Sequence, residues 1–288
     1  MQKSVTVDAP AKINLGLHVF PKRDDGYHNL MSIFTTVDLC DSITLSLTQE
    51  KNTCRVSVTN MTLPEENTFT IAYKAFCVLT GVEQGIDVNV TKRIPSGGGL
   101  GGGSSDASSF IQSMDLLCGT HLSKEDLTSI AGKVGSDVYF FTHALLEKSS
   151  EEKHYTAFVS GRGEVVEKIK SRSDYSLVLV FPEVFVSTKE AYKLVDLHMD
   201  KCKSVSPEQL KLMYTEPLAK WNFYNSFTRP VCSVYEKINE ALTALKKEGA
   251  VFADMSGSGS TVYGVFETEK DALKAQRNLA SVYKTVLA

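Results

Sequence analysis

The chain has 288 residues, of which 42% are hydrophobic and 23% are charged, and its formal net charge is −3. This length suffices for two hydrophobic cores, and the composition is that of a globular protein. The small negative charge excludes a general attraction to nucleic acids or to acidic membranes. The strongest apolar run, residues 177–186, contains Pro182 and Glu183 and is too short to cross a bilayer.

The N-terminus and the cysteines both favour a cytoplasmic protein. Residues 1–8 show no basic segment followed by an apolar one, so we expect a first strand here and no signal peptide. The six cysteines are scattered, without a Cys-x-x-Cys pair or a cluster with histidines. Reduced, mostly buried thiols and no structural metal site are therefore expected. These cysteines are Cys40, Cys54, Cys77, Cys118, Cys202 and Cys232.

The first third of the chain is rich in predicted strands. Asp24, Asp25 and Gly26 form a predicted turn between the second and the third of them. Residues 66–80, before the last strand, have helical periodicity and end at Gly81. β-Branched residues, alternating polarity or both mark the strands at residues 4–7, 13–20, 32–39, 42–47, 55–59 and 85–92.

Two glycine triplets flank Leu100 in the middle of the chain, within residues 95–107. Because glycine loses much conformational freedom on folding, so dense a cluster indicates a loop whose N–H groups face one ligand. Residues 105–118 follow with helical periodicity, and Ser104 or Ser105 is expected to cap this helix. Free amides at the positive end of a helix dipole bind anions, most often phosphate. The run therefore predicts a phosphate loop, against the alternative of a flexible surface loop.

Neither of the common phosphate-loop motifs fits this run. A Walker A loop ends in Gly-Lys-Ser or Gly-Lys-Thr, and no lysine follows the glycines here. Gly97, Gly99 and Gly102 match the spacing of a dinucleotide fingerprint, but runs of glycine match it by chance. No short βαβ unit with a ribose-binding acid accompanies them. The loop is thus predicted to bind phosphate in another way.

The second half of the chain alternates helices and strands. A further helix opens at Ser123 in the style of a capping box, and the polar residues 168–174 are the expected boundary between domains 1–170 and 171–288. Residues 201–208 form a loose polar region. This order suggests a ferredoxin-like, split-βαβ second domain. We expect its strands at 175–181, 250–255, 261–266 and the C-terminus, and its helices at 188–196, 233–248 and 270–281.

Lys12 and Asp137 are candidates for phosphate chemistry, each with an ordinary alternative. Lys12 lies in an apolar strand and shares a face with Asn14, two residues away. Burying a lysine there is costly unless an anion meets it, although a lysine at a strand end also reaches solvent. Asp137 precedes a bulky apolar run, where a carboxylate can accept a proton from a hydroxyl. A Gly-Ser-Asp triplet is more often a turn or a cap, and the local sequence alone favours that interpretation.

A second run of small residues, 254–260, lies between two predicted strands. It lines a nucleotide site or forms a tight hairpin, and the local sequence leaves both interpretations open.

Three motifs together resemble those of the GHMP small-molecule kinases. They are Pro-Ala-Lys-Ile-Asn-Leu from Pro10, the glycine loop, and Met-Ser-Gly-Ser-Gly-Ser from Met255. The runs 24–28 and 135–138 are similar to those of members that act on a cytidine-diphosphate-linked methylerythritol in the non-mevalonate isoprenoid pathway. The resemblance spans nearly the whole chain. It implies an α+β fold with a ribosomal-S5-domain-2-like first domain, a ferredoxin-like second domain and an active site in the cleft between them.

The resemblance implies ATP-dependent phosphorylation of the 2-hydroxyl of 4-diphosphocytidyl-2-C-methyl-D-erythritol. Asp137 would be the general base, and Lys12 would keep it ionised and stabilise charge on the transferred group. This outweighs the local interpretation of Asp137 as a turn residue. Mg²⁺ would accompany ATP, but the sequence identifies no protein ligand for it. The residues that would hold ATP are Pro95, Ser96, Gly97, Gly98, Gly99, Leu100, Gly101, Gly102, Gly103, Ser104 and Ser105.

The resemblance also implies where the substrate binds. Tyr27 and Tyr192 would stack on the two faces of the cytosine, and His28 and Thr188 would meet its hydrogen-bonding edge. Asn14 would contact polar groups of the substrate. Stacking is worth roughly 1–3 kcal/mol per base, so two faces would anchor the substrate. Without the resemblance, Tyr27 and His28 are typical of a surface hairpin and Tyr192 of a helix core.

Three features depart from the family pattern. Tyr139 stands where proline is expected, and Ser226 replaces the aspartate of an expected Asn-Asp pair. Asp106 would repel ATP if it faced the nucleotide, so we expect it to face away.

Several other functions remain as alternatives. A related kinase would act on a sugar, homoserine or a mevalonate-like alcohol. A silent nucleotide sensor conflicts with the presence of both Lys12 and Asp137, and an RNA-binding module conflicts with the net charge. The expected partner is a small molecule, with no nucleic acid and no membrane, and the protein is expected to be a monomer or a weak homodimer.

Overall fold

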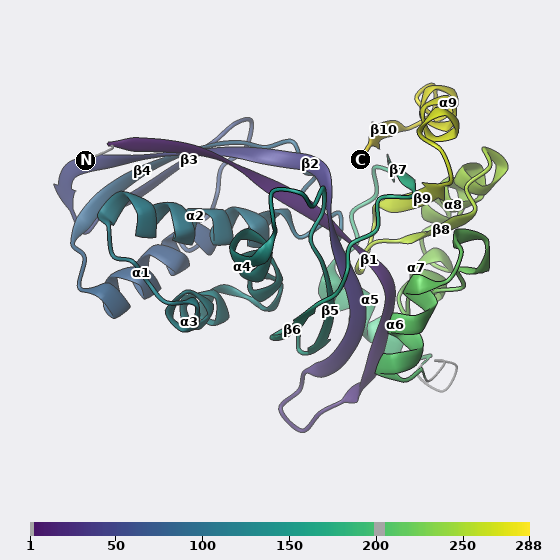
Figure 1. Ribbon diagram of the computed structural model, residues 1–288, viewed down its shortest axis with the longest axis horizontal. Coiled ribbons are helices and arrows are strands. Elements are labelled where there is room, and N and C mark those ends of the chain that lie inside the picture. Colours follow the sequence, from purple (N-terminus) through teal and green to yellow (C-terminus); the bar gives the residue numbers. More distant parts are fainter. Residues whose placement is uncertain (1–2, 199–204) are drawn as a thin grey trace. The chain divides into compact units, whose positions relative to one another are not determined.

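The computed structural model describes residues 3–198 and 205–288 (Figure 1). The chain forms two compact units, each assembled from separate stretches. Unit 1 comprises Met1–Ala11, Leu39–Ser96 and Gly101–Ser149, whereas unit 2 comprises Lys12–Asp38, Gly97–Leu100 and Ser150–Ala288. The expected boundary near residue 170 divides the chain into consecutive segments and stays a prediction. Cys202 and the first part of the polar region 201–208 lie outside the described residues.

The sheet of unit 1 is built on two long strands, β1 (Ser4–Lys22) and β2 (His28–Lys51). The second half of β2 pairs antiparallel with β4 (Gln84–Thr91), and β3 (Cys54–Val58) pairs parallel with β4. We predicted each long strand as two short ones. Residues 8–12 have little β-branched signal, yet Ala9 and Ala11 are fully buried in a continuous strand. Burial in the sheet therefore overrides weak local propensity here.

Helices α1 (Thr68–Thr80), α2 (Gly102–Cys118), α3 (Lys124–Val134) and α4 (Ser136–Glu147) gather on one face of this sheet (Figure 1). They share one apolar core with the strands, in which the rings of Phe69 and Phe110 meet edge to face. Helix α4 was not predicted, because its run of apolar residues hides the helical period.

The expected cap of α2 is wrong. The helix begins at Gly102, and its N-cap is Gly101, with a φ of 70° and no side-chain cap bond. Ser104 and Ser105 lie inside the helix, where the carbonyl of Gly101 accepts hydrogen bonds from both of their N–H groups. A left-handed glycine thus starts the helix in place of a capping hydroxyl.

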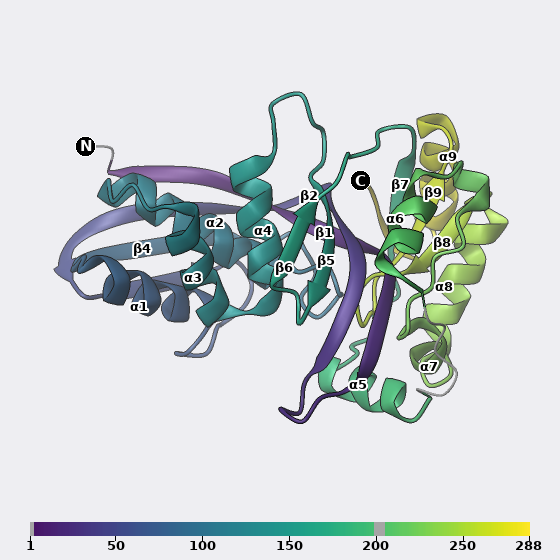
Figure 2. The same ribbon diagram turned by 60° about the horizontal axis from the view of Figure 1, so that its bottom comes forward.

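Unit 2 holds the hairpin between β1 and β2, drawn in purple in Figure 2. Strand β5 (Thr156–Gly161) pairs antiparallel with the first half of β2, and β6 (Val165–Lys168) pairs with β5. Neither strand was predicted. They lie in a stretch of mixed polar and apolar residues that gave no clear alternation.

The second sheet of unit 2 is antiparallel, in the order β10-β7-β9-β8. In chain order this is a 4-1-3-2 arrangement, and α8 (Glu236–Lys247) and α9 (Glu269–Leu279) follow its first and third strands. The expectation of a split-βαβ, ferredoxin-like fold is confirmed. The strands are β7 (Ser176–Phe181), β8 (Phe252–Met255), β9 (Val262–Phe266) and β10 (Lys284–Leu287).

Short helices complete unit 2. Helix α5 (Thr188–Asp196) was predicted, and α6 (Pro207–Thr215), η2 (Leu218–Lys220) and α7 (Thr228–Cys232) were not. The five cysteines among the described residues are free thiols. No described helix is both long and apolar enough to cross a membrane.

Candidate active site

The glycine loop alternates in backbone handedness. Gly97, Gly99 and Gly101 have φ values of 68°, 74° and 70°, whereas Gly98 and Leu100 are not among the residues with positive φ. Such alternation turns successive N–H groups toward one side and forms an anion-binding concavity, or nest. The loop leads directly into α2, where the N–H groups of the first turn are exposed to a ligand.

Three consecutive carbonyl groups of the loop are held within unit 2. The carbonyl of Gly98 accepts from the N–H of Thr261 at 3.2 Å, and that of Leu100 accepts from the N–H of Lys12 at 3.0 Å. The carbonyl of Gly99 accepts from the Oγ of Ser256 at 2.9 Å and from the Nζ of Lys12 at 3.1 Å. In a trans peptide the next N–H points the opposite way. The N–H groups that follow these carbonyls are therefore directed away from the groups that hold the loop.

Gly99 could not be another residue in this arrangement. A Cβ atom placed on it would lie 2.0 Å from the carbonyl oxygen of Ser256, and its positive φ disfavours a side chain as well. Ser256 belongs to the second run of small residues, which connects the antiparallel strands β8 and β9. The run is therefore a hairpin loop that packs on the glycine loop, and its place at a nucleotide site stays a prediction.

Lys12 and Asn14 share a face of β1, as the alternation of the strand predicted. Lys12 is 3% exposed, and its Nζ donates to the Oδ1 of Asn14 at 2.7 Å. The ammonium also lies 4.7 Å from the centre of the Phe34 ring. The amide nitrogen of Asn14 donates to the Oγ of Ser32 at 3.2 Å. Lys12 therefore does not snorkel to solvent, and it holds the glycine loop through Gly99.

The hairpin residue His28 stacks on Tyr192 of α5. Their ring centres are 5.0 Å apart with an interplanar angle of 24°, and Phe227 meets Tyr192 edge to face. The Nδ1 of His28 lies 2.8 Å from the carbonyl oxygen of Phe20, so Nδ1 carries a proton. Its Nε2 lies 3.4 Å from an Oδ1 of Asp196. This arrangement fixes the orientation of the imidazole.

Tyr27 lies beside this group and is exposed. Its side chain is 54% accessible, and the guanidinium carbon of Arg162 lies 3.7 Å from the centre of its ring. Thr188 begins α5, and its hydroxyl is 3.4 Å from that of Ser258. Unit 2 thus brings His28 and Tyr192 into contact, and it joins Thr188 to the small-residue loop.

Asp137 belongs to unit 1, in the first turn of α4. The N-cap of α4 is Gly135, which makes no side-chain cap bond, and Asp137 is the acidic residue of the first turn. Tyr139 packs on α3: a Cβ atom at Gly132 would lie 2.1 Å from the Tyr139 hydroxyl. The departure at Tyr139 is therefore accommodated by a glycine on the neighbouring helix.

The departure at Ser226 also has a structural account. Its Oγ accepts from the N–H of Val19 at 3.0 Å, and its N–H donates to the carbonyl of Leu17 at 2.8 Å. The side-chain amide of Asn225 donates to the carbonyls of Met255 and Gly257. These two residues tie β1 to the small-residue loop within unit 2.

Asp106 is not directed to solvent. It is 3% exposed, and its Oδ2 lies 2.8 Å from the Nζ of Lys92. No local pattern indicated this partner, because Lys92 lies at the end of a predicted strand. Asp106 is therefore buried beside a cation, and its orientation away from the nucleotide stays a prediction.

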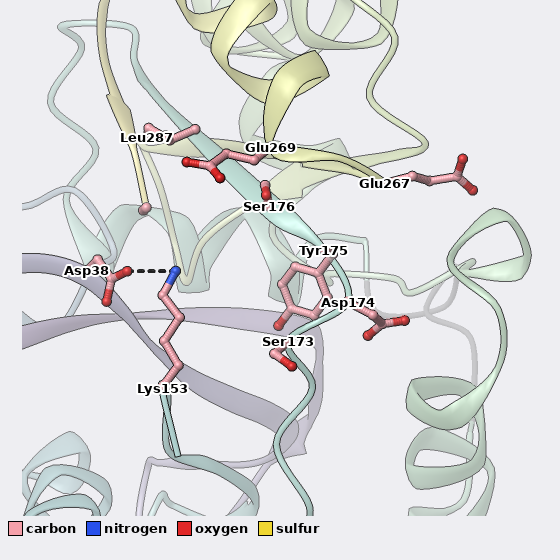
Figure 3. Close-up of a pocket in the computed structure, with 10 residues that line it drawn as sticks. Asp38, Lys153, Ser173, Asp174, Tyr175, Ser176, Glu267, Glu269 and Leu287 are labelled. Atoms are coloured by element: carbon pink, nitrogen blue, oxygen red, sulfur yellow. Dashed lines mark ion pairs between the residues drawn. The ribbon is translucent and has the colours of Figure 1, made fainter. Parts of the chain in front are cut away.

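A cavity of about 620 Å³ in unit 2 does not suit a phosphate (Figure 3). Four of its described lining residues are acidic, and the one lysine among them, Lys153, pairs with Asp38 at 2.9 Å. Asp174 pairs with Arg172, but a polyphosphate there would meet Glu267 and Glu269, which form no ion pair among the described residues. The four acids are Asp38, Asp174, Glu267 and Glu269.

Comparison with known proteins identifies the family. Residues 67–144 match the model of the GHMP kinase N-terminal domain, and residues 215–285 match that of the GHMP kinase C-terminal domain. A 4-diphosphocytidyl-2-C-methyl-D-erythritol kinase from Treponema pallidum is 37% identical over 96% of this chain and 95% of its own length. One from Prosthecochloris aestuarii is 35% identical over 98% and 96%, respectively.

A solved structure supports the same assignment. A crystal structure of 4-(cytidine 5'-diphospho)-2C-methyl-D-erythritol kinase covers 98% of each chain, with a TM-score of 0.80 and 27% identity. The two-domain α+β fold expected from the sequence is therefore confirmed. The chain belongs to the GHMP kinases, within them to the family of 4-diphosphocytidyl-2-C-methyl-D-erythritol kinases, and is an ATP-dependent kinase.

Proposed function

We propose that this kinase transfers the γ-phosphoryl group of ATP to the 2-hydroxyl of 4-diphosphocytidyl-2-C-methyl-D-erythritol. The names of relatives that match nearly the whole chain support this acceptor. The observation that carries the kinase chemistry is the glycine loop, whose consecutive carbonyls are held so that the following N–H groups remain available for phosphate.

ATP fits the residues of this loop. Alternating φ values and the start of α2 provide N–H donors, and Ser105 has a buried hydroxyl that makes no hydrogen bond among the described residues. We assign the binding of ATP to residues 95–105. Mg²⁺ would be carried by the phosphates and neutralise part of their charge.

Asp137 is the proposed general base, and Lys12 is the cation that assists it. Asp137 lies in the first turn of α4, and a carboxylate can accept the proton of the acceptor hydroxyl. Lys12 is held in place by Asn14 and by the carbonyl of Gly99 in the phosphate loop. An ammonium fixed there would stabilise negative charge on a phosphoryl group at that loop.

The cytidine would bind beside the β1–β2 hairpin. The stacked pair of His28 and Tyr192 offers an aromatic surface, and the hydrogen bond from His28 Nδ1 to the carbonyl of Phe20 fixes the imidazole. Tyr27 is exposed enough for a base to stack on it, and Thr188 and Asn14 supply polar groups. This assignment distinguishes a cytidine-linked acceptor from a simple sugar or amino-alcohol, which would need no aromatic pair.

Phosphate transfer from ATP to the cytidine-linked acceptor tests the proposal. Wild type should form the 2-phosphate, and Asp137→Asn should lose at least about a hundredfold in kcat while it still binds ATP, since general-base catalysis supplies roughly 10²–10⁴-fold. Tyr27→Ala is the matched test of the substrate site and should raise only the acceptor KM.

The outcomes separate the parts of the proposal. Full activity of Asp137→Asn would remove Asp137 from the mechanism but leave the reaction. An unchanged acceptor KM in Tyr27→Ala would count against the cytidine pocket. If wild type bound ATP but transferred nothing to this acceptor, the proposed substrate would be wrong.

A further inference from the structure

A buried charge cluster joins the two ends of the glycine loop within unit 1. Asp41 comes from β2, Lys92 follows β4 directly, and Asp106 lies near the start of α2. Their side chains are 0%, 15% and 4% exposed, respectively. The Nζ of Lys92 contacts both carboxylates, the Oδ2 of Asp106 at 2.8 Å and the Oδ2 of Asp41. One ammonium thus links three elements of the unit.

Asp41 also holds the backbone that leads into the loop. Its Oδ1 accepts hydrogen bonds from the N–H groups of Arg93 and Ile94, at 2.5 and 2.8 Å. These are the last two residues before Pro95, where the loop begins. A carboxylate that accepts two backbone N–H groups fixes the direction in which the chain leaves β4.

The other end of the loop is fixed beside the same lysine. Gly102, the first residue of α2, packs so closely that a Cβ atom on it would lie 2.9 Å from Cγ2 of Ile94 and 3.3 Å from Nζ of Lys92. Asp106, four residues further on, accepts the hydrogen bond from Lys92. Asp41, which holds the backbone before the loop, and Asp106, which lies near the start of α2, therefore both contact the buried ammonium of Lys92.

We propose that Asp41, Lys92 and Asp106 are positioning residues of the ATP site, which hold the two ends of the glycine loop together so that its N–H groups are preorganised for phosphate. The inference rests on the proposed assignment of ATP to this loop. A glycine-rich segment has many conformations when its ends are free, and ordering it would subtract from the binding free energy. The cluster removes that cost before ATP binds, so its loss should weaken ATP binding and not acceptor binding.

The electrostatics of the cluster are compatible with a neighbouring polyphosphate. The pKa of Asp106 is raised to about 7. Burial is the largest cause and Asp41 adds to it, whereas Lys92 lowers the pKa. Burial lowers the pKa of Lys92, but Asp106 and Asp41 outweigh it, so Lys92 stays charged. Near pH 7 Asp106 is therefore partly protonated, which limits the negative charge beside the loop.

Two substitutions of nearly equal size test the role of Asp106. Asp106→Leu removes the acceptor for Lys92, whereas Asp106→Asn keeps an oxygen in its place. We expect Asp106→Leu to raise the KM and the Kd for ATP about tenfold, with the acceptor KM within about twofold of wild type. Asp106→Asn should restore ATP affinity to within about threefold of wild type, because a neutral oxygen still accepts from the ammonium.

Phe76→Leu is the control for stability, since Phe76 is fully buried in the core of unit 1 and belongs to α1, not to the loop or the charge cluster. It should lower the unfolding midpoint while it leaves the KM for ATP unchanged. If Asp106→Leu lowered stability in the same way but left ATP affinity unchanged, the cluster would be structural only and the proposal would be overturned. Equal loss in Asp106→Asn and Asp106→Leu would also contradict it.

Gly99→Val separates this proposal from the assignment of the ATP site. A side chain there collides with the carbonyl of Ser256 and should abolish ATP binding if the loop holds ATP. Loss of binding in Gly99→Val with none in Asp106→Leu would reject the positioning role alone. Wild-type ATP binding in Gly99→Val would reject the loop as the ATP site, and the positioning role with it.

Discussion

Two buried carboxylates adjoin the two small-residue loops, and the protein holds them by different means. Asp106 follows the glycine loop in unit 1, and its partner is the ammonium of Lys92. Asp254 is the first residue of the small-residue run of unit 2, and its Oδ1 accepts from the hydroxyl of Thr228 at 2.5 Å and from the N–H of Met255 at 2.8 Å. Unit 1 thus uses a charge where unit 2 uses neutral donors.

Both arrangements raise the pKa of the carboxyl, for related reasons. Burial raises the pKa of Asp254 to about 6, although the hydrogen bonds from Thr228 and Met255 lower it. At Asp106 burial again dominates, and the second carboxylate of Asp41 offsets much of the help from Lys92. The shared cation therefore lowers the pKa of Asp106 no more effectively than the two neutral donors lower the pKa of Asp254. The arrangements differ instead in what happens when the partner is removed.

Removal of the cation should have the largest effect. Lys92→Met leaves two buried carboxylates without their ammonium, and we expect a loss of about 3–5 kcal/mol in the free energy of unfolding. Urea denaturation measures it. Lys124→Met is the matched control, because Lys124 pairs with Glu147 at a partly exposed position and should cost no more than about 1 kcal/mol.

A double variant decides whether the loss arises from the uncompensated charge. Lys92→Met combined with Asp106→Leu removes a cation and a carboxylate together, so part of the stability should return. If the double variant were less stable than Lys92→Met by the full cost of Asp106→Leu, the two side chains would be independent and the cluster would not act as described.

Removal of the neutral donor should cost less. Thr228→Val keeps the shape of the side chain but deprives Asp254 of its hydroxyl donor, and we expect a loss of about 1–3 kcal/mol. Thr243→Val makes the same change on the exposed side of α8, where the hydroxyl donates to the carbonyl of Asn239, and should change stability little. Equal effects of the two substitutions would show that the bond to Asp254 contributes nothing of its own.

The second sheet could be predicted from the sequence better than the first. Strands β7 and β9 carry β-branched residues, and the strands of this sheet alternate with helices of clear periodicity, so their order along the chain indicated the ferredoxin-like arrangement. The long strands β1 and β2 pass through residues of weak propensity, such as Ala9 and Ala11, which are buried by tertiary packing. Single-sequence signals do not report that packing.

The motifs of the candidate site could be predicted from the sequence, but the buried charge cluster around Lys92 could not. The glycine loop and the shared face of Lys12 and Asn14 followed from residue type and spacing. The cluster around Lys92 did not, because its carboxylates are 51 residues before and 14 residues after the lysine in sequence. The position of Asp106 beside a phosphate loop led only to the expectation that it faces away from the nucleotide. Such long-range partners are set by topology, which local patterns leave open.

The dependence of stability on pH gives the smallest effect and the sharpest comparison of the two carboxyls. The pKa of Asp254 is about 6 in the folded protein against an ordinary value of 3.8, so the folded state binds this proton more tightly than the unfolded state. The resulting stabilisation is complete below pH 3.8 and is lost as the pH rises through about 6. Relative to Asp254→Asn, wild type should therefore lose about 1 kcal/mol per pH unit between pH 4.5 and 5.5.

Relative to Asp106→Asn, wild type should also lose stability as the pH rises. This loss should extend over a wider pH range than for Asp254, since the pKa of Asp106 is about 7. Urea denaturation at half-unit steps from pH 4 to 8 measures both differences. Above pH 6 the difference from Asp254→Asn should level off, while that from Asp106→Asn should continue to pH 7. Parallel curves for wild type and either variant would mean that the carboxyl in question is not protonated by burial. Lys92 contacts both Asp41 and Asp106. If the stability difference for Asp106→Asn levelled off at a lower pH than that for Asp254→Asn, Lys92 would stabilise the ionised form of Asp106 more than that of Asp41.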